Sequence, residues 1–399
     1  MTAINTKFDI VISGGGLSGA LTALSLSLLN RGNKAPLSIA IVENAPINQN
    51  PSLNFDDRVL ALSHQSVSYL ADLGVWQHMR QAATGIETIH ISDQGYYGKA
   101  RVYAKDHHVS ALGVVIEMAL IGKAIYQCLE NVKNITWYCP NTIASVDYHA
   151  DSVDLELDDE QKLSATLLLG CDGGHSVVRK SAGIDVTTKL YQQSAVIANV
   201  STAVKHNNVA FERFTKSGPL AMLPLSKDRC SLVWTLSPEQ AHQVSSLSDD
   251  KFKQALYTAF GGWLGDITHV GERAVFPLNL IQANEQVYHR TILIGNASHT
   301  IHPIAGQGFN LGLRDTRDLA KVLQQALDDD QDIGGLNLLQ HYQMMRKQDH
   351  QQVIGLTDSL VTLFSNDLPP LVIGRNIGLK ALNYLACIKH PFVAKTMGY

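Results

Sequence analysis

The chain has 399 residues, 45% hydrophobic and 17% charged, a composition that excludes intrinsic disorder and is typical of a folded protein. Its 36 acidic and 32 basic side chains give a net charge of −4, which argues against a nucleic-acid binder, whose affinity depends on clustered basic charge. Five widely spaced cysteines without a C-x-x-C pair argue against a disulfide framework or a zinc site and favour a reducing compartment.

The N-terminal residues MTAINTKFDIVISGGG lack a basic segment followed by an apolar stretch, so we expect no signal peptide. No uncharged apolar run reaches the roughly 18 residues that a membrane span requires. We therefore expect a cytoplasmic protein. A chain of this length also predicts two lobes rather than one small core.

The first part of the chain predicts a βαβ unit. Residues 8–13 are expected to form a strand, residues 19–30 a helix with small residues on one side, and residues 38–43 a second apolar strand. Residues 56–73 then predict a helix, and the alternation of residues 86–92 predicts a strand.

The next segment continues the same mixture of helices and strands. We expect a helix at 122–131, a strand at 135–138, a hairpin pair at 142–148 and 153–157, and a buried strand at 165–171.

After about residue 185 the pattern changes to short strands separated by polar turns, which predicts an antiparallel sheet and a second lobe. These strands are expected at 195–200, 209–214, 221–225 and 231–235. Residues 291–295 return to the buried parallel type, a helix follows at about 308–326, and the last seventy residues predict helices. The second lobe therefore interrupts the first.

A glycine fingerprint lies between the first strand and the first helix. Gly14 permits a tight turn, Gly16 lets the backbone approach a pyrophosphate, and Gly19 lets helix and strand pack closely. Glu43 ends the second strand, where a carboxylate can accept hydrogen bonds from both ribose hydroxyls. This context predicts a dinucleotide site but does not distinguish FAD from NAD.

Two later motifs each end a buried strand. The first is GCDGGHSVVR at residues 170–179, and the second is GNASHTIHPIAGQGFN at residues 295–310, where a strand runs into a helix. The backbone N–H groups near Gly306 to Gly308 are candidates to face a carbonyl or a developing anion.

The three motifs in this order resemble the single-component flavoprotein aromatic hydroxylases, the para-hydroxybenzoate hydroxylase-like family. The resemblance implies an α/β fold: a Rossmann-like FAD-binding domain built from discontinuous segments, an inserted mainly antiparallel-sheet substrate domain and a helical C-terminus. The expected FAD-binding segments are 1–75, 100–185 and 275–335, the substrate domain 76–99 and 186–274, and the helical region 336–399.

The resemblance also implies roles for named residues. Glu43 is expected to bind the adenosine ribose, Arg58 to lie near the pyrophosphate or ribityl chain, and Asp172 with Gly173 to orient groups at the pyrophosphate. Asn296 replaces a usual aspartate that binds the ribityl chain; its amide oxygen can still accept a hydroxyl proton. The remaining cofactor contacts are expected at Gly14, Gly16, Gly19, Pro303, Gly306, Gln307, Gly308 and Asn310.

Catalysis in such a protein rests on the cofactor. NAD(P)H is expected to bind transiently and reduce FAD, O₂ to form a flavin C4a-hydroperoxide, and an electron-rich phenol to attack its distal oxygen. The backbone at Pro303, Gly306 and Gly308 is expected to border the flavin, and the amides near Gly306 and Gly308 are candidates to stabilise negative charge on it. His299 and His302 are candidates for a base that ionises the phenol; a structural role is the alternative. No metal is expected.

The segments GNASHTIHPIAGQGFNLGLRD and TDSLVTLFSNDLPPLVIGRNIGL resemble the ubiquinone-biosynthesis branch of the family, which implies a prenylated phenol as substrate and other proteins of that pathway as partners. Two alternatives stay open: a hydroxylase of a small soluble aromatic compound, with Arg213 as the candidate cation for a carboxylate, and a non-catalytic FAD-binding subunit of a complex.

Two further segments have alternative interpretations. Met222, Leu223, Pro224, Leu225 and Trp234 are expected either to line the substrate pocket or to form ordinary sheet core. Residues 369–399 contain Arg375, Lys380, Lys389 and Lys395 interleaved with apolar residues and no acid, which suits either peripheral contact with the inner membrane or docking on protein.

Overall fold

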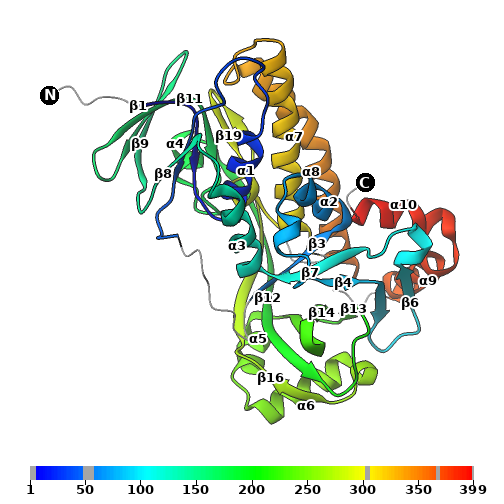
Figure 1. Ribbon diagram of the computed structural model, residues 1–399. Coiled ribbons are helices and arrows are strands. Elements are labelled where there is room, and N and C mark those ends of the chain that lie inside the picture. The colour runs from blue at the N-terminus through cyan, green and yellow to red at the C-terminus, as the bar shows by residue number, and fades with distance from the viewer. Residues whose placement is uncertain (1–5, 48–57, 302–305, 365–368, 398–399) are drawn as a thin grey trace.

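A computed structural model of the protein describes residues 6–47, 58–301, 306–364 and 369–397. Two large sheets and one small sheet form the framework, and helices pack around them (Figure 1). The expected α/β fold class is confirmed, including the helical C-terminus.

The first sheet has eight strands, and its central part is parallel in the order β19-β11-β1-β2-β8. The predicted hairpin is present as β9 and β10, which pair antiparallel and extend β11. The strands are β1 (Thr6–Ser13), β2 (Ile39–Val42), β8 (Ile135–Tyr138), β9 (Ile143–Tyr148), β10 (Val153–Leu157), β11 (Lys162–Gly170), β18 (Val287–Tyr288) and β19 (Thr291–Leu293).

Protein covers both faces of the central strands, which explains why their sequences are almost continuously apolar. Ile10 and Ile12 of β1 pack with α1 (Leu17–Ser27) and α7 (Gln307–Asp328), whereas Val11 packs on the opposite face with the hairpin. The helix α3 (Met118–Leu129) packs beside α1.

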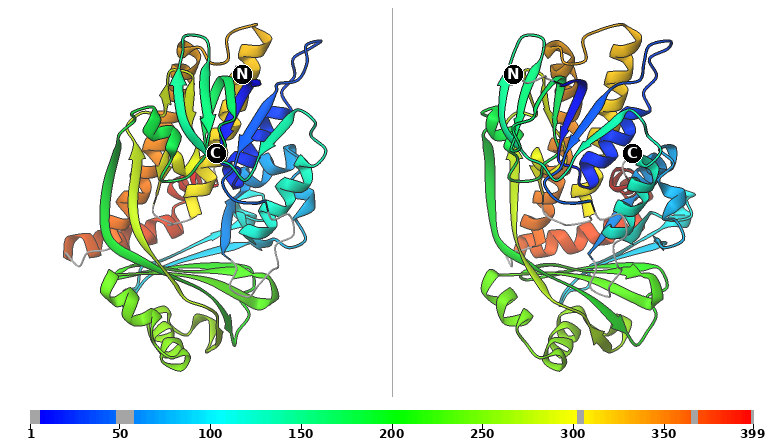
Figure 2. Two further views of the ribbon diagram at one scale, coloured as in Figure 1. Left: turned by 90° about the vertical axis from the view of Figure 1, so that its left-hand side faces the viewer. Right: turned by 60° about the vertical axis from the view of Figure 1, so that its left-hand side comes forward.

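The second sheet has nine strands and is mainly antiparallel, as expected, although β13 pairs parallel with β5. Helices α5 (Pro238–Ser245) and α6 (Asp249–Phe260) cover one of its faces, and the rest of the molecule lies on the other (Figure 2). Its strands are β5 (Thr88–Asp93), β6 (Lys99–Tyr103), β12 (Val186–Thr202), β13 (Val209–Thr215), β14 (Gly218–Leu225), β15 (Arg229–Leu236), β16 (Ile267–Val270), β17 (Ala274–Ala283) and β20 (His299–Thr300).

A small sheet of β3 (Val59–Ser63), β7 (Gly113–Glu117) and β4 (Thr84–Ile86) contradicts one prediction. The helix expected at 56–73 is wrong in its first half, because β3 finds a distant antiparallel partner in β7. Helix α2 (His64–Asp72) begins only after Ser63, whose side chain accepts the N–H of Ser66.

The C-terminal part consists of α8 (Leu336–Phe364), α9 (Pro369–Tyr384) and α10 (Ala386–Thr396). Among the described helices, none is both long and apolar enough to cross a membrane. Residues 99–103 and 274–283 belong to the nine-stranded sheet, so the exact division into an FAD-binding and a substrate domain stays a prediction.

A buried cluster of charges fastens α7 to α8. Asp315 of α7 is fully buried, and one of its carboxylate oxygens, Oδ1, accepts hydrogen bonds at 2.7 Å from Arg346 Nε and His350 Nε2 of α8. Arg346 also contacts Asp318 at 2.8 Å and Asp349 at 2.7 Å. The surrounding carboxylates hold the pKa of Arg346 above its usual range, and these contacts in turn lower the pKa of Asp315.

The Arg346→Met substitution should lower the free energy of unfolding by about 3–5 kcal/mol, because it leaves the Asp315 carboxylate buried without its cation. Urea denaturation at pH 7 measures this difference. Lys347→Met, one position along the same helix on an exposed residue, is the control and should change stability by less than about 0.5 kcal/mol. Equal loss in both variants would contradict this account of the cluster.

Candidate functional site

The three sequence motifs meet at one edge of the eight-stranded sheet, because their strands end in register. Ser13 of β1 pairs with Gly170 of β11, and Gly170 pairs with Leu293 of β19. Backbone hydrogen bonds continue just beyond, from Cys171 N to Ser13 O at 2.8 Å and from Ile294 N to Gly170 O at 2.9 Å. The carboxyl edge of a parallel sheet is where α/β proteins bind ligands.

The glycines of the first motif differ in what surrounds them. Gly14 has φ +94°, and a Cβ there would lie 2.6 Å from the carbonyl oxygen of Cys171. A Cβ at Gly19 would overlap the carbonyl oxygen of Gly14. At Gly16, in contrast, a Cβ would meet nothing within 4 Å. Two glycines therefore permit close packing, and the third faces open space that a pyrophosphate can fill.

The amino-terminal end of α1 is open to an anion. Gly16 is its N-cap, no side chain caps the helix, and no acid lies in its first turn. Beside it, the Glu43 carboxylate accepts the backbone N–H of Gly15 at 2.6 Å and that of Ala45 at 2.9 Å. The positive helix end and the carboxylate offer complementary contacts for a phosphate and for ribose hydroxyls.

In the described structure, only one of the two carboxylate oxygens of Asp172, in the second motif, accepts a hydrogen bond. Its Oδ2 accepts the N–H of Val177 at 2.7 Å and so caps the short helix α4 (Val177–Ser181). Its Oδ1 is buried and has no hydrogen-bond partner among the residues that the structure describes. Since an unpaired buried oxygen is costly, this atom is suited to accept a hydrogen bond from a bound ligand.

Arg179, the last residue of the second motif, was given no role by the sequence analysis. It is buried, and its guanidinium donates at 2.7 Å to the carbonyl oxygens of both Ala297 and Gly174. Ser176 supports it by accepting the Arg179 N–H at 2.9 Å. Arg179 therefore ties the second motif to the third; its place in the motif was the available signal.

Asn310 holds the glycine turn of the third motif against β3. It is 1% exposed, and its Oδ1 accepts from Ser63 N at 2.9 Å and Ser66 Oγ at 2.7 Å. Its Nδ2 donates to Ala61 O at 2.8 Å and to Gly306 O at 2.6 Å. These contacts make Asn310 a positioning residue for the turn, and the expected direct contact with the cofactor stays a prediction.

Gly306 begins α7 with φ +61° as its N-cap, and a Cβ there would lie 2.9 Å from Ala61 Cβ. Gln307 is buried, and Gly308 follows it in the first turn of α7. The backbone N–H groups at a helix start such as this one suit an anion or a carbonyl.

The remaining expected site residues differ in what the structure says of them. Asn296 is exposed at the carboxyl edge, and the side chain of Arg58 is exposed just before β3. Gly173, with φ +80°, forms the turn after Asp172. His302 and Pro303 lie outside the described residues.

His299 lies in the buried charge cluster rather than in the open. It is 1% exposed, and its ring stacks edge-on against His350 at a centroid distance of 4.7 Å. Burial, followed by the nearby His350, lowers the pKa of His299 to about 3. A histidine with this pKa is a poor base near pH 7, which favours the structural alternative left open by the sequence.

His299, Asp315 and His350 place one ligand atom each within 4.8 Å of one another, a spacing that a metal ion could use. Asp315 is, however, already paired with the Arg346 guanidinium at 2.7 Å. This cation opposes a metal ion electrostatically, so the cluster is better explained as an ion-pair network.

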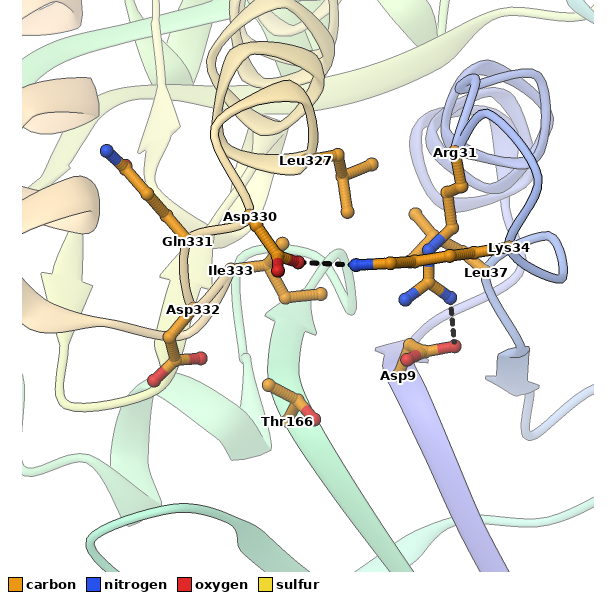
Figure 3. A pocket seen from close by; sticks show the side chains of 10 residues that line it. All are labelled: Asp9, Arg31, Lys34, Leu37, Thr166, Leu327, Asp330, Gln331, Asp332 and Ile333. Atoms are coloured by element: carbon orange, nitrogen blue, oxygen red, sulfur yellow. Dashed lines mark hydrogen bonds and ion pairs between the residues drawn. The ribbon is translucent and has the colours of Figure 1, made fainter.

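A hollow of about 200 Å³ lies elsewhere, near the start of β1 (Figure 3). Asp9, Arg31, Thr166 and Lys34 contribute to its wall, with ion pairs from Arg31 to Asp9 and from Lys34 to Asp330. It lies away from the carboxyl edge where the motifs converge, so it belongs to a different part of the surface.

The residues at the carboxyl edge fit FAD. A dinucleotide can fill the open space at Gly16 and accept hydrogen bonds from the uncapped start of α1. It can also donate a hydrogen bond to Oδ1 of Asp172, which has no partner among the described residues. NAD would make the same contacts. The second and third motifs converge on the same edge, however, and extend the site beyond a single glycine fingerprint, which favours FAD.

Comparison with known proteins agrees with this geometry. The chain matches the FAD binding domain family over residues 7–357. It is 33% identical to the ubiquinone hydroxylase UbiL of Rhodospirillum rubrum over 98% of this chain and 89% of that one. It is 32% identical to the 3-demethoxyubiquinol 3-hydroxylase of Escherichia coli over 99% of each chain.

Among solved structures, p-nitrophenol 4-monooxygenase PnpA from Pseudomonas putida DLL-E4 has the same fold. The TM-score is 0.79 with 17% sequence identity, over 99% of each chain.

Alanine substitutions should separate the packing glycines from the one that faces open space. Gly16→Ala should change the free energy of unfolding of the apoprotein by less than about 0.5 kcal/mol yet raise the Kd for FAD at least tenfold, about 1.4 kcal/mol. Gly19→Ala should destabilise the apoprotein by about 1–3 kcal/mol because of its clash with Gly14. Flavin fluorescence titration and denaturation measure the two effects; unchanged FAD affinity in Gly16→Ala would refute the assignment.

Proposed function

Because the chain belongs to the FAD binding domain family and is an FAD-dependent monooxygenase, we propose that it hydroxylates the aromatic ring of a prenylated phenol in ubiquinone biosynthesis. The observation that carries this proposal is the similarity, over nearly the whole chain, to two hydroxylases of ubiquinone or its precursors. A nine-stranded sheet with one face turned toward the flavin-binding part of the molecule supports it.

In this proposal the carboxyl edge holds FAD. Gly14 and Gly19 shape the turn by close packing, Gly16 leaves the space that receives the pyrophosphate, and Glu43 binds the adenosine ribose. Asp172 accepts a hydrogen bond from the cofactor through Oδ1, which has no partner in the part of the chain that the structure describes. Arg58, Gly173, Asn296, Pro303 and the segment from Gly306 to Gly308 complete the contacts.

When FAD is bound and reduced by NAD(P)H, it would supply the electrons for a reaction in which one atom of O₂ enters the ring hydroxyl and the other leaves as water. The protein contributes placement and electrostatics. The backbone N–H groups from Gly306 to Gly308, at the start of α7, would stabilise negative charge on the bound flavin. Asn310 keeps this turn in position through its hydrogen bonds to Ala61 and Gly306.

Arg213, the candidate cation for a small carboxylated substrate, does not lie on the sheet face that is turned toward the flavin-binding part. Arg213 donates to the carbonyl oxygen of Ala259 at 3.1 Å, so it lies on the sheet face that α6 covers. On that same face, Met222 and Trp234 pack into the core, in agreement with the sheet-core interpretation. Leu223 and Leu225 lie on the opposite face.

The purified holoenzyme should oxidise NAD(P)H faster when a short-chain prenylated phenol is added, and ¹⁸O₂ should place one labelled oxygen on the ring. Mass spectrometry of the product gives the label and the position. A benzoate of the same ring pattern is the control and should not be hydroxylated. NAD(P)H oxidation that yields only hydrogen peroxide with every prenylated phenol would refute the proposal.

We also propose that α9 contacts the membrane surface in which such a substrate dissolves. Ile373, Ile377 and Tyr384 are 58%, 56% and 78% exposed and share one side of the helix. Arg375, expected to contribute basic charge, is instead buried and donates to Asp93 at 2.7 Å. The contact therefore rests mainly on apolar side chains.

Replacing both Ile373 and Ile377 by Ser should reduce co-sedimentation with phosphatidylglycerol-containing liposomes severalfold, and added salt should have little effect on the wild type because the contact is apolar. The control replaces the exposed Met344 and Met345 of α8 by Ser. Equal binding of both double variants would argue against α9 as the contact surface.

A further inference from the structure

Glu212 occupies the middle of β13, on the sheet face that is turned toward the flavin-binding part. Side chains alternate along a strand, and Phe211 and Arg213 contact α6 through Phe260 and Ala259. Glu212 therefore projects from the opposite face, together with Ala210 and Phe214. Those two neighbours belong to apolar clusters on that face, and Phe214 stacks on Phe364 of α8 at 3.6 Å.

A row of partly exposed side chains crosses the sheet at Glu212. Register partners in adjacent strands share a face, and this row is otherwise apolar. It consists of Ile91, Glu212, Ala221, Val233 and Ile197 on β5, β13, β14, β15 and β12. All five are partly exposed, whereas Met222, Leu232 and Trp234 on the other face are buried. The row thus lines an interior surface that solvent still reaches.

The same side of the sheet carries the glycine turn of the third motif. Val115 of β7 packs against Ala210 and Leu225 of the nine-stranded sheet. β7 pairs with β3, and Ala61 of β3 contacts Gly306. A molecule lying on the row would therefore have the carboxyl of Glu212 on one side and the turn that we assign to the flavin toward the other.

Charged groups on this side of the sheet are already paired with one another. Arg229 of β15 donates to Glu117 of β7 at 2.8 Å, and Arg375 of α9 donates to Asp93 of β5 at 2.7 Å. Within the described part of the chain, Glu212 has neither a cation nor a hydrogen-bond donor against it. The Glu212 side chain is partly exposed, and its partial desolvation on this apolar row raises the pKa of the carboxyl to about 7.

We propose that Glu212 is a catalytic residue that accepts the phenolic proton of the substrate. The phenolic O–H bond breaks, the proton joins a carboxylate oxygen of Glu212, and the electron pair stays on the phenolic oxygen. The ring then carries more electron density where it receives oxygen. After oxygen transfer the proton returns to the phenolic oxygen, so Glu212 is regenerated. This assignment rests on the proposed phenol hydroxylation.

The position suits this role chemically. A base is most effective when its pKa is close to the working pH, because it is then largely unprotonated and still basic. His299, the candidate from the sequence, has its pKa lowered to about 3 and is enclosed in the charge cluster between α7 and α8. Glu212 lies instead on a partly exposed apolar surface where a prenylated ring can rest.

The activity test compares wild type, Glu212→Gln and Glu212→Asp on a prenylated phenol from pH 5.5 to 9. Wild-type kcat/KM should fall as the pH drops through about 7, because protonated Glu212 cannot accept the proton. Glu212→Gln should lower kcat/KM by about 10²- to 10⁴-fold and abolish this dependence. Glu212→Asp should keep the dependence at a reduced rate. Glu239→Gln, on the exposed surface of α5, is the control.

A second measurement needs no substrate. The folded-state pKa lies above the ordinary glutamate value, so the ionised side chain destabilises the fold, and stability contributed by the protonated form is lost as the pH rises through about 7. Glu212→Gln should therefore have a higher Tm than wild type at pH 8, and the difference should shrink toward pH 5. A carboxylate whose ionised form is stabilised by a cation or by hydrogen-bond donors would give the opposite sign.

The outcomes separate the two proposals. If wild type hydroxylates the phenol and Glu212→Gln keeps both its rate and its pH dependence, Glu212 is not the base and the proposed function stands. If wild type hydroxylates no phenol while the Tm difference is present, the proposed function fails, and with it the role of this carboxyl in proton transfer. A Tm of Glu212→Gln below wild type at pH 8 would overturn the inference directly.

Discussion

The functional edge of the molecule depends on the register of three parallel strands. β1, β11 and β19 come from distant parts of the sequence, yet their last residues Ser13, Gly170 and Leu293 are aligned by backbone hydrogen bonds. Because each strand is followed at once by a glycine-rich turn, this alignment gathers all three motifs at one edge. The close approach of Gly14 to Cys171 limits the first turn to a residue without a side chain.

Buried polar groups hold in place the turns that follow these strands. Arg179 bridges the second and third motifs through two carbonyl oxygens, and Asn310 fastens the start of α7 to β3. Behind them, Asp315 joins α7 to Arg346 and His350 of α8. The hydrogen bonds of Arg179, Asn310 and Asp315 Oδ1 are specific in geometry, since leaving a buried polar group unpaired is costly. These contacts fix the relative positions of the turns at the carboxyl edge of the sheet.

Much of this arrangement could be predicted from the sequence, for local reasons. The β1–α1–β2 unit, the β9–β10 hairpin and the strands of the second sheet follow from hydrophobic periodicity and turn residues. The helix predicted over 56–73 was wrong over residues 59–63, which pair as β3 with β7 some fifty residues farther along, and it was confirmed over residues 64–72. Periodicity in a short apolar segment does not distinguish a strand from a helix when the deciding contact is distant.

The sequence by itself determined the α/β class and FAD as the cofactor, and it predicted the cofactor-binding edge and its glycines, because those features depend on local turns and on motifs of fixed spacing. Only the tertiary structure decided which side chains face which interior. It placed Met222 and Trp234 against α5 and α6, buried His299 and Arg375 among charges, and left Glu212 on the face turned toward the flavin-binding part. Strand register and burial set these outcomes, and both arise from contacts between residues that are far apart in the chain.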